Sequence, residues 1–110
     1  MMNKEERVAQ AVAYFKEGYN CAQSVVLAYA DLYGLTHDLA LHVAASFGGG
    51  IGRMRETCGA ACGMFLLAGF ERCATSGADR EGKAANYALV QQLAEAFKQE
   101  HGTIKCGELL

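Results

Sequence analysis

Cysteine is the residue type in this 110-residue sequence with the most distinctive chemistry. Its thiolate attacks disulfides and binds soft metal ions. An odd number of cysteines argues against a secreted disulfide scaffold. In a reducing compartment such cysteines are buried, metal-bound or redox-active. The five cysteines are Cys21, Cys58, Cys62, Cys73 and Cys106.

Two of these cysteines directly follow residues that typically cap helices. Cys21 follows Asn20 and Cys58 follows Thr57, so each cysteine is predicted to be the first residue of a helix. The partial positive charge of a helix N-terminus favours a thiolate. The alternative is that both are small residues packed in a helical core.

The positions of Cys62 and Cys73 predict different roles for these two cysteines, one a further candidate ligand and the other a structural thiol. Cys62 lies one helical turn after Cys58, about 6 Å along the axis, which suits two ligands of one metal better than an intrahelical disulfide. Cys73 lies eleven residues after Cys62. That separation is about 16 Å in a straight helix, so Cys73 is interpreted as a structural thiol at the opposite end.

A glycine-rich segment, residues 48–52, precedes the second cysteine. No strand precedes it and no Lys-Ser/Thr pair follows, so it is not a dinucleotide-binding fingerprint or a P-loop. We expect a tight backbone passage beneath the cysteines, in which Gly49 and Gly50 direct N–H groups at thiolates or a cluster sulfide. Arg53 and Arg55 either add positive charge there or are ordinary solvated loop residues.

Hydrophobic periodicity and capping residues predict an all-α fold, a compact antiparallel bundle in a single domain over residues 1–110. The fourth helix is apolar nearly all round and is expected at the centre. The five predicted helices span residues 4–17, 21–33, 37–47, 58–75 and 80–101.

The predicted topology gathers distant cysteines. Short connections favour antiparallel neighbours, which brings the starts of helices 21–33 and 58–75 and the end of helix 80–101 to one end of the bundle. Cys21, Cys58 and Cys106 are therefore expected to lie together, with Cys62 at the edge of the group. A crossover connection would undo this arrangement.

Composition excludes several classes of protein. Hydrophobic residues make up 52% and the formal net charge is −2, so the chain can form a core and has no nucleic-acid footprint. Its longest apolar stretch, residues 58–70, is too short to span a bilayer. The N-terminus does not read as a secretory signal, and a cytoplasmic location is expected.

Four segments together resemble the C_GCAxxG_C_C family of redox-active proteins, over roughly residues 14–110. The resemblance implies a cysteine cluster, an oxidoreductase or electron-transfer partner and, as one alternative, an iron–sulfur cluster or other metal. No C-x-x-C-H pattern for haem attachment is present. The segments are Asn20-Cys21-Ala22, Phe47-Gly48-Gly49-Gly50-Ile51-Gly52, Cys58-Gly59-Ala60-Ala61-Cys62-Gly63 and His101-Gly102-Thr103-Ile104-Lys105-Cys106.

The chain departs from this family at its end, where a further cysteine usually follows the position of Cys106. Either Cys62 has taken over that role or the site has three cysteines. The first hypothesis is thiol–disulfide exchange by Cys21, Cys58 and Cys106, or a thiolate-bound metal or iron–sulfur site that also uses Cys62.

The alternative is a non-catalytic metal-binding or structural helical interaction module. Whether the chain is an enzyme is left open, and so is the cofactor: an iron–sulfur cluster, a single metal or none. A homodimer is a further expectation, through an apolar surface of Ile51, Met54 and Met64.

Overall fold

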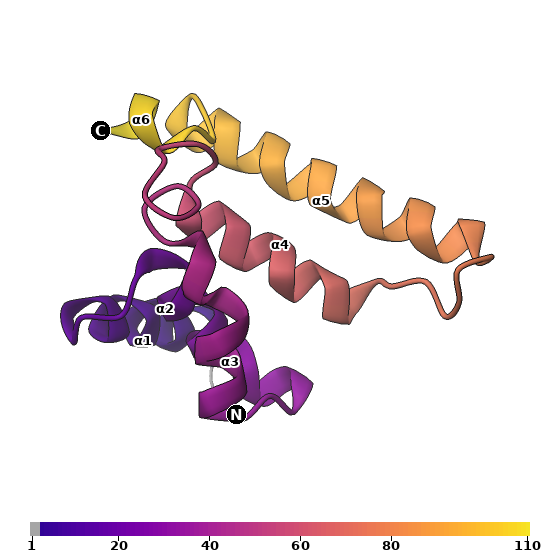
Figure 1. Ribbon diagram of the computed structural model, residues 1–110, viewed down its shortest axis with the longest axis horizontal. Helices are drawn as coiled ribbons and strands as arrows, with labels where there is room; N and C mark the ends of the chain where they lie inside the picture. The colour runs from indigo at the N-terminus through magenta and orange to yellow at the C-terminus, as the bar shows by residue number, and fades with distance from the viewer. Residues whose placement is uncertain (1–2) are drawn as a thin grey trace.

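The computed structural model describes residues 3–110, and these residues form helices and no strand (Figure 1). The all-α prediction is therefore confirmed. Two short 3-10 helices, η1 (Ala30–Tyr33) and η2 (Ala45–Phe47), extend α2 and α3. The α-helices are α1 (Lys4–Lys16), α2 (Cys21–Tyr29), α3 (His37–Ala44), α4 (Gly59–Glu71), α5 (Arg80–His101) and α6 (Cys106–Leu109).

Local capping sets the start of most helices. Asn20 accepts a hydrogen bond from the Gln23 N–H at 2.8 Å, and the Gln23 side chain accepts one from the Asn20 N–H at 3.1 Å. This capping box fixes Cys21 as the first residue of α2. Thr36 and Asp79 cap α3 and α5 through their own side chains. The predicted starts of α1, α2, α3 and α5 are confirmed.

The predicted helix over 58–75 differs from the structure at both ends. Cys58 is the N-cap rather than the first helical residue, and Thr57 is not the cap. The cause is tertiary: the Cys58 N–H donates to the Ile104 carbonyl at 2.6 Å, which holds Cys58 in a non-helical conformation. At the other end α4 stops at Glu71, and the C-terminal segment forms the short α6, which was not predicted.

The hydrophobic core is built around α2, which packs against α1, α3 and α4. Most of its members are small, which allows the helices to approach closely. A Cβ placed on Gly63 would lie 2.9 Å from Val25 Cβ and 3.1 Å from the Ala22 carbonyl oxygen. Because α2 and α4 meet at this glycine, their register is fixed. The core cluster contains Ala22, Val26, Leu27, Ala30, Ala40, Ala44 and Leu67.

A buried arginine fastens α1 to the end of α2. Arg7 is buried, and its guanidinium donates to the Ala28 carbonyl at 2.9 Å and to the Asp31 carboxylate at 2.7 Å. The hydrogen bond from Arg7 lowers the pKa of Asp31. The guanidinium also lies 5.4 Å from the centre of the Tyr29 ring, so hydrogen bonds, charge and an aromatic face together hold α1 in place.

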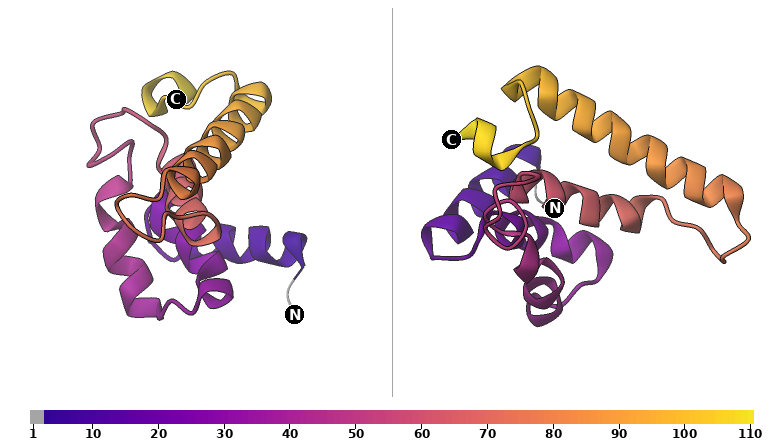
Figure 2. Two further views of the ribbon diagram at one scale, coloured as in Figure 1. Left: turned by 90° about the vertical axis from the view of Figure 1, so that its right-hand side faces the viewer. Right: turned by 45° about the horizontal axis from the view of Figure 1, so that its top comes forward.

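Helices α4 and α5 form an antiparallel hairpin that projects from the rest of the molecule (Figures 1 and 2). Helix α4 lies between α2 and α5, as its apolar sequence predicts, while α5 packs chiefly on α4. None of the 22 residues of α5 is fully buried. No helix within residues 3–110 is both long and apolar enough to cross a membrane.

The contact at Gly63 predicts a large difference between two glycine substitutions in the same helix. Gly63→Ala should lower the free energy of unfolding by about 1–3 kcal/mol, because the added methyl group collides with Val25 and the α2 backbone. Gly69→Ala meets no atom within 4 Å and should stabilise the protein by up to about 1 kcal/mol. Urea unfolding of both variants measures this, and equal effects would contradict the packing argument.

Candidate functional site

The first cysteine of the candidate site lies against the start of α4. A Cβ on Gly59 would overlap the Cys21 sulfur and would come within 2.8 Å of the Phe47 carbonyl oxygen. The half-buried Cys21 therefore lies beside the residue that directly follows Cys58. This contact follows from the predicted topology, in which the starts of α2 and α4 lie at the same end.

The C-terminal segment pairs with the backbone just before α4. Thr57 and Lys105 form an isolated antiparallel bridge, flanked by bonds from the Cys58 N–H to the Ile104 carbonyl at 2.6 Å and from the Cys106 N–H to the Glu56 carbonyl at 2.5 Å. Cys58 and Cys106 therefore occupy diagonal positions of an antiparallel pair. Residues in this relation share a face, with Cα atoms about 7–8 Å apart.

The Cys106 side chain lies between the glycine-rich loop and an arginine. A Cβ on Gly50 would lie 2.6 Å from Cys106 Cβ and 2.8 Å from the backbone of Arg55, so only glycine fits there. The Arg55 guanidinium donates toward the Cys106 sulfur at 3.7 Å. Of the two loop arginines, Arg55 thus provides positive charge beside a cysteine, a role that the sequence left open.

The loop before α4 uses its own carbonyls as hydrogen-bond partners. The Arg55 N–H donates to Gly49 at 3.2 Å and the Glu56 N–H donates to Gly50 at 3.0 Å. Gly49 and Gly50 have positive φ angles, as do Ile51, Arg53 and Arg55. The loop is therefore a tight and strained coil that carries Gly50 beneath Cys106. Cofactor binding by Gly49 and Gly50 stays a prediction.

Cys62 is the buried member of the group. Burial raises the pKa of its thiol, and the nearby thiols of Cys58 and Cys21 raise that pKa further. The Cys62 sulfur also lies 3.8 Å from the Thr57 carbonyl, to which the thiol donates. Cys62 therefore ionises less readily than an exposed thiol and is buried, whereas Cys21, Cys58 and Cys106 are each half-buried.

Cys73 lies apart from the other four cysteines. It follows the end of α4, in the connection to α5, and α4 itself spans about 20 Å. The prediction that Cys73 lies within a helix is wrong, because α4 ends two residues earlier. The thiol is exposed, and its position leaves it available as an internal control for reactivity.

The four grouped cysteines do not form a ready set of metal ligands. Within residues 3–110, no three Cys, His, Asp or Glu side chains lie close enough together to hold a metal ion. The Cys62 and Cys106 sulfurs instead interact with the Thr57 carbonyl and the Arg55 guanidinium. Metal binding by these residues stays a prediction.

Comparison with known proteins adds one finding. The model of the family described as "Putative redox-active protein (C_GCAxxG_C_C)" matches residues 19–110. Comparisons with curated proteins and with solved structures found no match. The matched segment includes all five cysteines and the glycine-rich loop.

The environment of Cys62 predicts the order of thiol alkylation. At pH 7 we expect Cys62 to react most slowly of the five cysteines, because burial raises its pKa above the ordinary value of 9.0. Cys21 and Cys58 should react earlier, and the exposed Cys73 provides the reference rate. Pulsed alkylation at pH 7, 8 and 9, read by peptide mass spectrometry, measures this order.

The same shift has a stability consequence. In the unfolded chain Cys62 ionises near pH 9.0, while in the folded chain it stays neutral to higher pH. Stability should therefore fall as the pH rises above that value.

In the alkylation experiment, a Cys62 thiol that reacts as fast as the Cys73 thiol in the folded protein at pH 7 would show that the Cys62 thiol is not protected.

Proposed function

Because this chain belongs to the C_GCAxxG_C_C family of redox-active proteins, we propose that it performs thiol–disulfide exchange with Cys58 and Cys106 as the redox pair. The pairing of Thr57 with Lys105 carries this proposal, since it holds both cysteines on one face of the same two backbone segments. Both thiols are half-buried, so a partner can reach them.

The two cysteines lie slightly farther apart than the residues that a disulfide joins. Disulfides span Cα distances of about 4.4–6.8 Å, slightly less than the 7–8 Å typical of diagonal positions. Closing the bond requires a shift of about 1 Å or slightly more in one segment. The tail after α5 is a short connection followed by the four-residue α6, and it is the segment that moves.

The exchange runs in two balanced steps. The Cys106 thiolate, beside the Arg55 guanidinium, attacks one sulfur of a partner disulfide, and the partner's other sulfur leaves as a thiolate. Cys58 loses its proton and attacks the Cys106 sulfur of this mixed disulfide, which releases the partner's second thiolate. The two cysteines are oxidised to a disulfide, and the partner disulfide takes up two electrons and two protons.

The other two cysteines have supporting roles in this proposal. Cys21 lies against Gly59, the residue after Cys58, and can exchange with Cys58. Cys62 stays protonated because its thiol is buried, so it does not compete for the partner disulfide at neutral pH. The cysteines that take part in exchange are therefore the half-buried ones, which lie at the same end of the fold.

Oxidation of the purified protein tests this function. After equilibration in glutathione redox buffers and rapid alkylation, peptide mapping should show a Cys58–Cys106 disulfide, and Cys58→Ser and Cys106→Ser should each abolish it. Cys73→Ser is the matched control and should leave the linkage and its midpoint potential unchanged, because Cys73 lies at the far end of α4.

Two results would overturn the proposal. The first is full oxidation without a Cys58–Cys106 linkage. The second is a protein purified without oxygen that carries stoichiometric iron or zinc which Cys58→Ser and Cys106→Ser both remove, because the thiolates would then be ligands. Circular dichroism of each variant verifies that the helical fold is retained.

A further inference from the structure

The α4–α5 hairpin exposes more apolar surface than is expected for a hairpin that faces only water. Residues 84–94 of α5 contain no charged side chain over three helical turns, although none of them is fully buried. Tyr87 in this segment is 60% exposed. A helix that is covered chiefly by α4 and that faces water elsewhere is expected to carry charges on its free faces.

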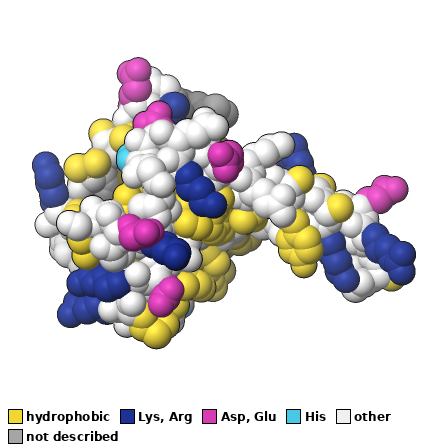
Figure 3. Space-filling model, turned by 90° about the horizontal axis from the view of Figure 1, so that it is seen from above, with side chains coloured by type: hydrophobic (Ala, Val, Ile, Leu, Met, Phe, Trp, Pro, Cys, Tyr) yellow, Lys and Arg dark blue, Asp and Glu magenta, His cyan; other side chains and the backbone are white. Residues whose placement is uncertain are grey.

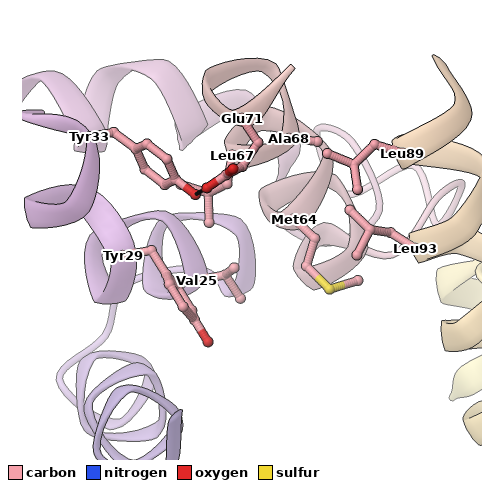
Figure 4. Close-up of a pocket in the computed structure, with 9 residues that line it drawn as sticks. All are labelled: Val25, Tyr29, Tyr33, Met64, Leu67, Ala68, Glu71, Leu89 and Leu93. Atoms are coloured by element: carbon pink, nitrogen blue, oxygen red, sulfur yellow. Dashed lines mark hydrogen bonds between the residues drawn. The ribbon is translucent and has the colours of Figure 1, made fainter. Parts of the chain in front are cut away.

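An apolar groove lies between this hairpin and the body of the molecule. Its floor is α4, with Met64 and Leu67, and its walls are α2 with η1 on one side and α5 on the other (Figure 4). Tyr29 and Tyr33 belong to the first wall, and Leu89 and Leu93 to the second. The cavity measures about 260 Å³.

The groove continues toward α1. A second cavity of about 280 Å³ adjoins the first at Val25 and is lined by Val12 and Phe15 of α1 and by Cys21. Val12 is 48% exposed and Phe15 is 59% exposed. Seen from above, the hairpin projects from the body of the molecule (Figure 3).

The solvent-accessible surface of the chain is larger than that of a compact monomer of the same mass. A compact monomer of 11.8 kDa exposes about 5,900 Å², whereas this chain exposes 6980 Å². The excess of about 1,000 Å² is close to the roughly 800 Å² that each partner buries in a stable interface. The radius of gyration of 14.0 Å likewise exceeds the value of about 13 Å for a compact chain of this length.

We infer that this surface is the interface of a symmetric homodimer, in which the α4–α5 hairpin of each copy packs into the groove of the other between α1 and α5. A two-fold interface requires one patch to contain both the projecting and the receiving element. The hairpin supplies the projecting element, and the groove beside it receives the same element of the second copy. The size of the excess surface corresponds to one such interface.

The interface of this dimer differs from the one expected from the sequence. It also affects access to one of the cysteines. Of Ile51, Met54 and Met64, only Met64 lines the groove. Because Cys21 lines the α1 end of the groove, the second copy covers one side of Cys21. Access to Cys21 is then restricted in the dimer, whereas Cys106, against Gly50, stays outside the interface.

Sedimentation of wild-type protein and exposed-residue variants tests the inference. Wild type should sediment at twice 11.8 kDa, and Phe15→Glu should raise the dimer dissociation constant by about 30-fold or more, as for a hot-spot residue of an interface. Phe15 is largely exposed in the single chain, so the substitution should not impair folding. Leu39→Glu is the matched control: Leu39 is 49% exposed on α3, and its variant should remain dimeric.

Alkylation supplies a second readout. Phe15→Glu should increase the labelling rate of Cys21 and leave that of Cys106 unchanged, while circular dichroism matches wild type. A wild-type protein that is monomeric at 100 µM, on the order of ten times a moderate dissociation constant, would overturn the inference. So would a Phe15→Glu variant that dimerises as tightly as Leu39→Glu.

Discussion

The parallel packing of α2 against α4 is the contact on which the rest of the structure depends. It exists because Gly59 and Gly63 present no side chain to α2, so Cys21 lies directly on one glycine and Val25 on the other. This contact aligns the starts of the two helices and brings Cys21 next to Cys58. The loop and the C-terminal tail then close over the same end, and the hairpin extends away from it. A methyl group at either glycine would separate the helices and disperse the thiols.

The sequence predicted the elements whose ends depend on nearby residues. Asn20 and Asp79 cap helices through partners only three residues away, so their positions can be recognised locally. The start of α4 could not be predicted, because the conformation of Cys58 depends on Ile104, which pairs with it from the tail. The burial of Arg7 was missed for the same reason, since its partners belong to the end of α2. Hydrophobic periodicity also cannot tell whether the same chain or a second copy covers an apolar helix face.

The candidate site was predictable in its residue types but not in its connections. Capping and topology indicated Cys21, Cys58 and Cys106, and the structure provides a specific neighbour for each of them. The glycine-rich loop was expected to direct N–H groups at a bound group. In the structure, the Ile51 and Gly52 N–H groups donate to the carbonyls of Phe47 and Ser46, and Gly50 also makes room for Cys106. The sequence identifies a glycine position, whereas only the tertiary structure shows which residue packs against it.

The bridge between Thr57 and Lys105 joins residues 48 positions apart, with the whole hairpin between them. Contacts of such long range form late in folding, since the loop must close before they contribute. During synthesis, the segment containing Cys106 emerges after α4 and α5 have had time to form. Cys21, Cys58 and Cys62 are therefore present together before Cys106 arrives. For the redox pair proposed above, an oxidant that acts in this interval would link other cysteines, so formation of the Cys58–Cys106 disulfide depends on folding being faster than oxidation.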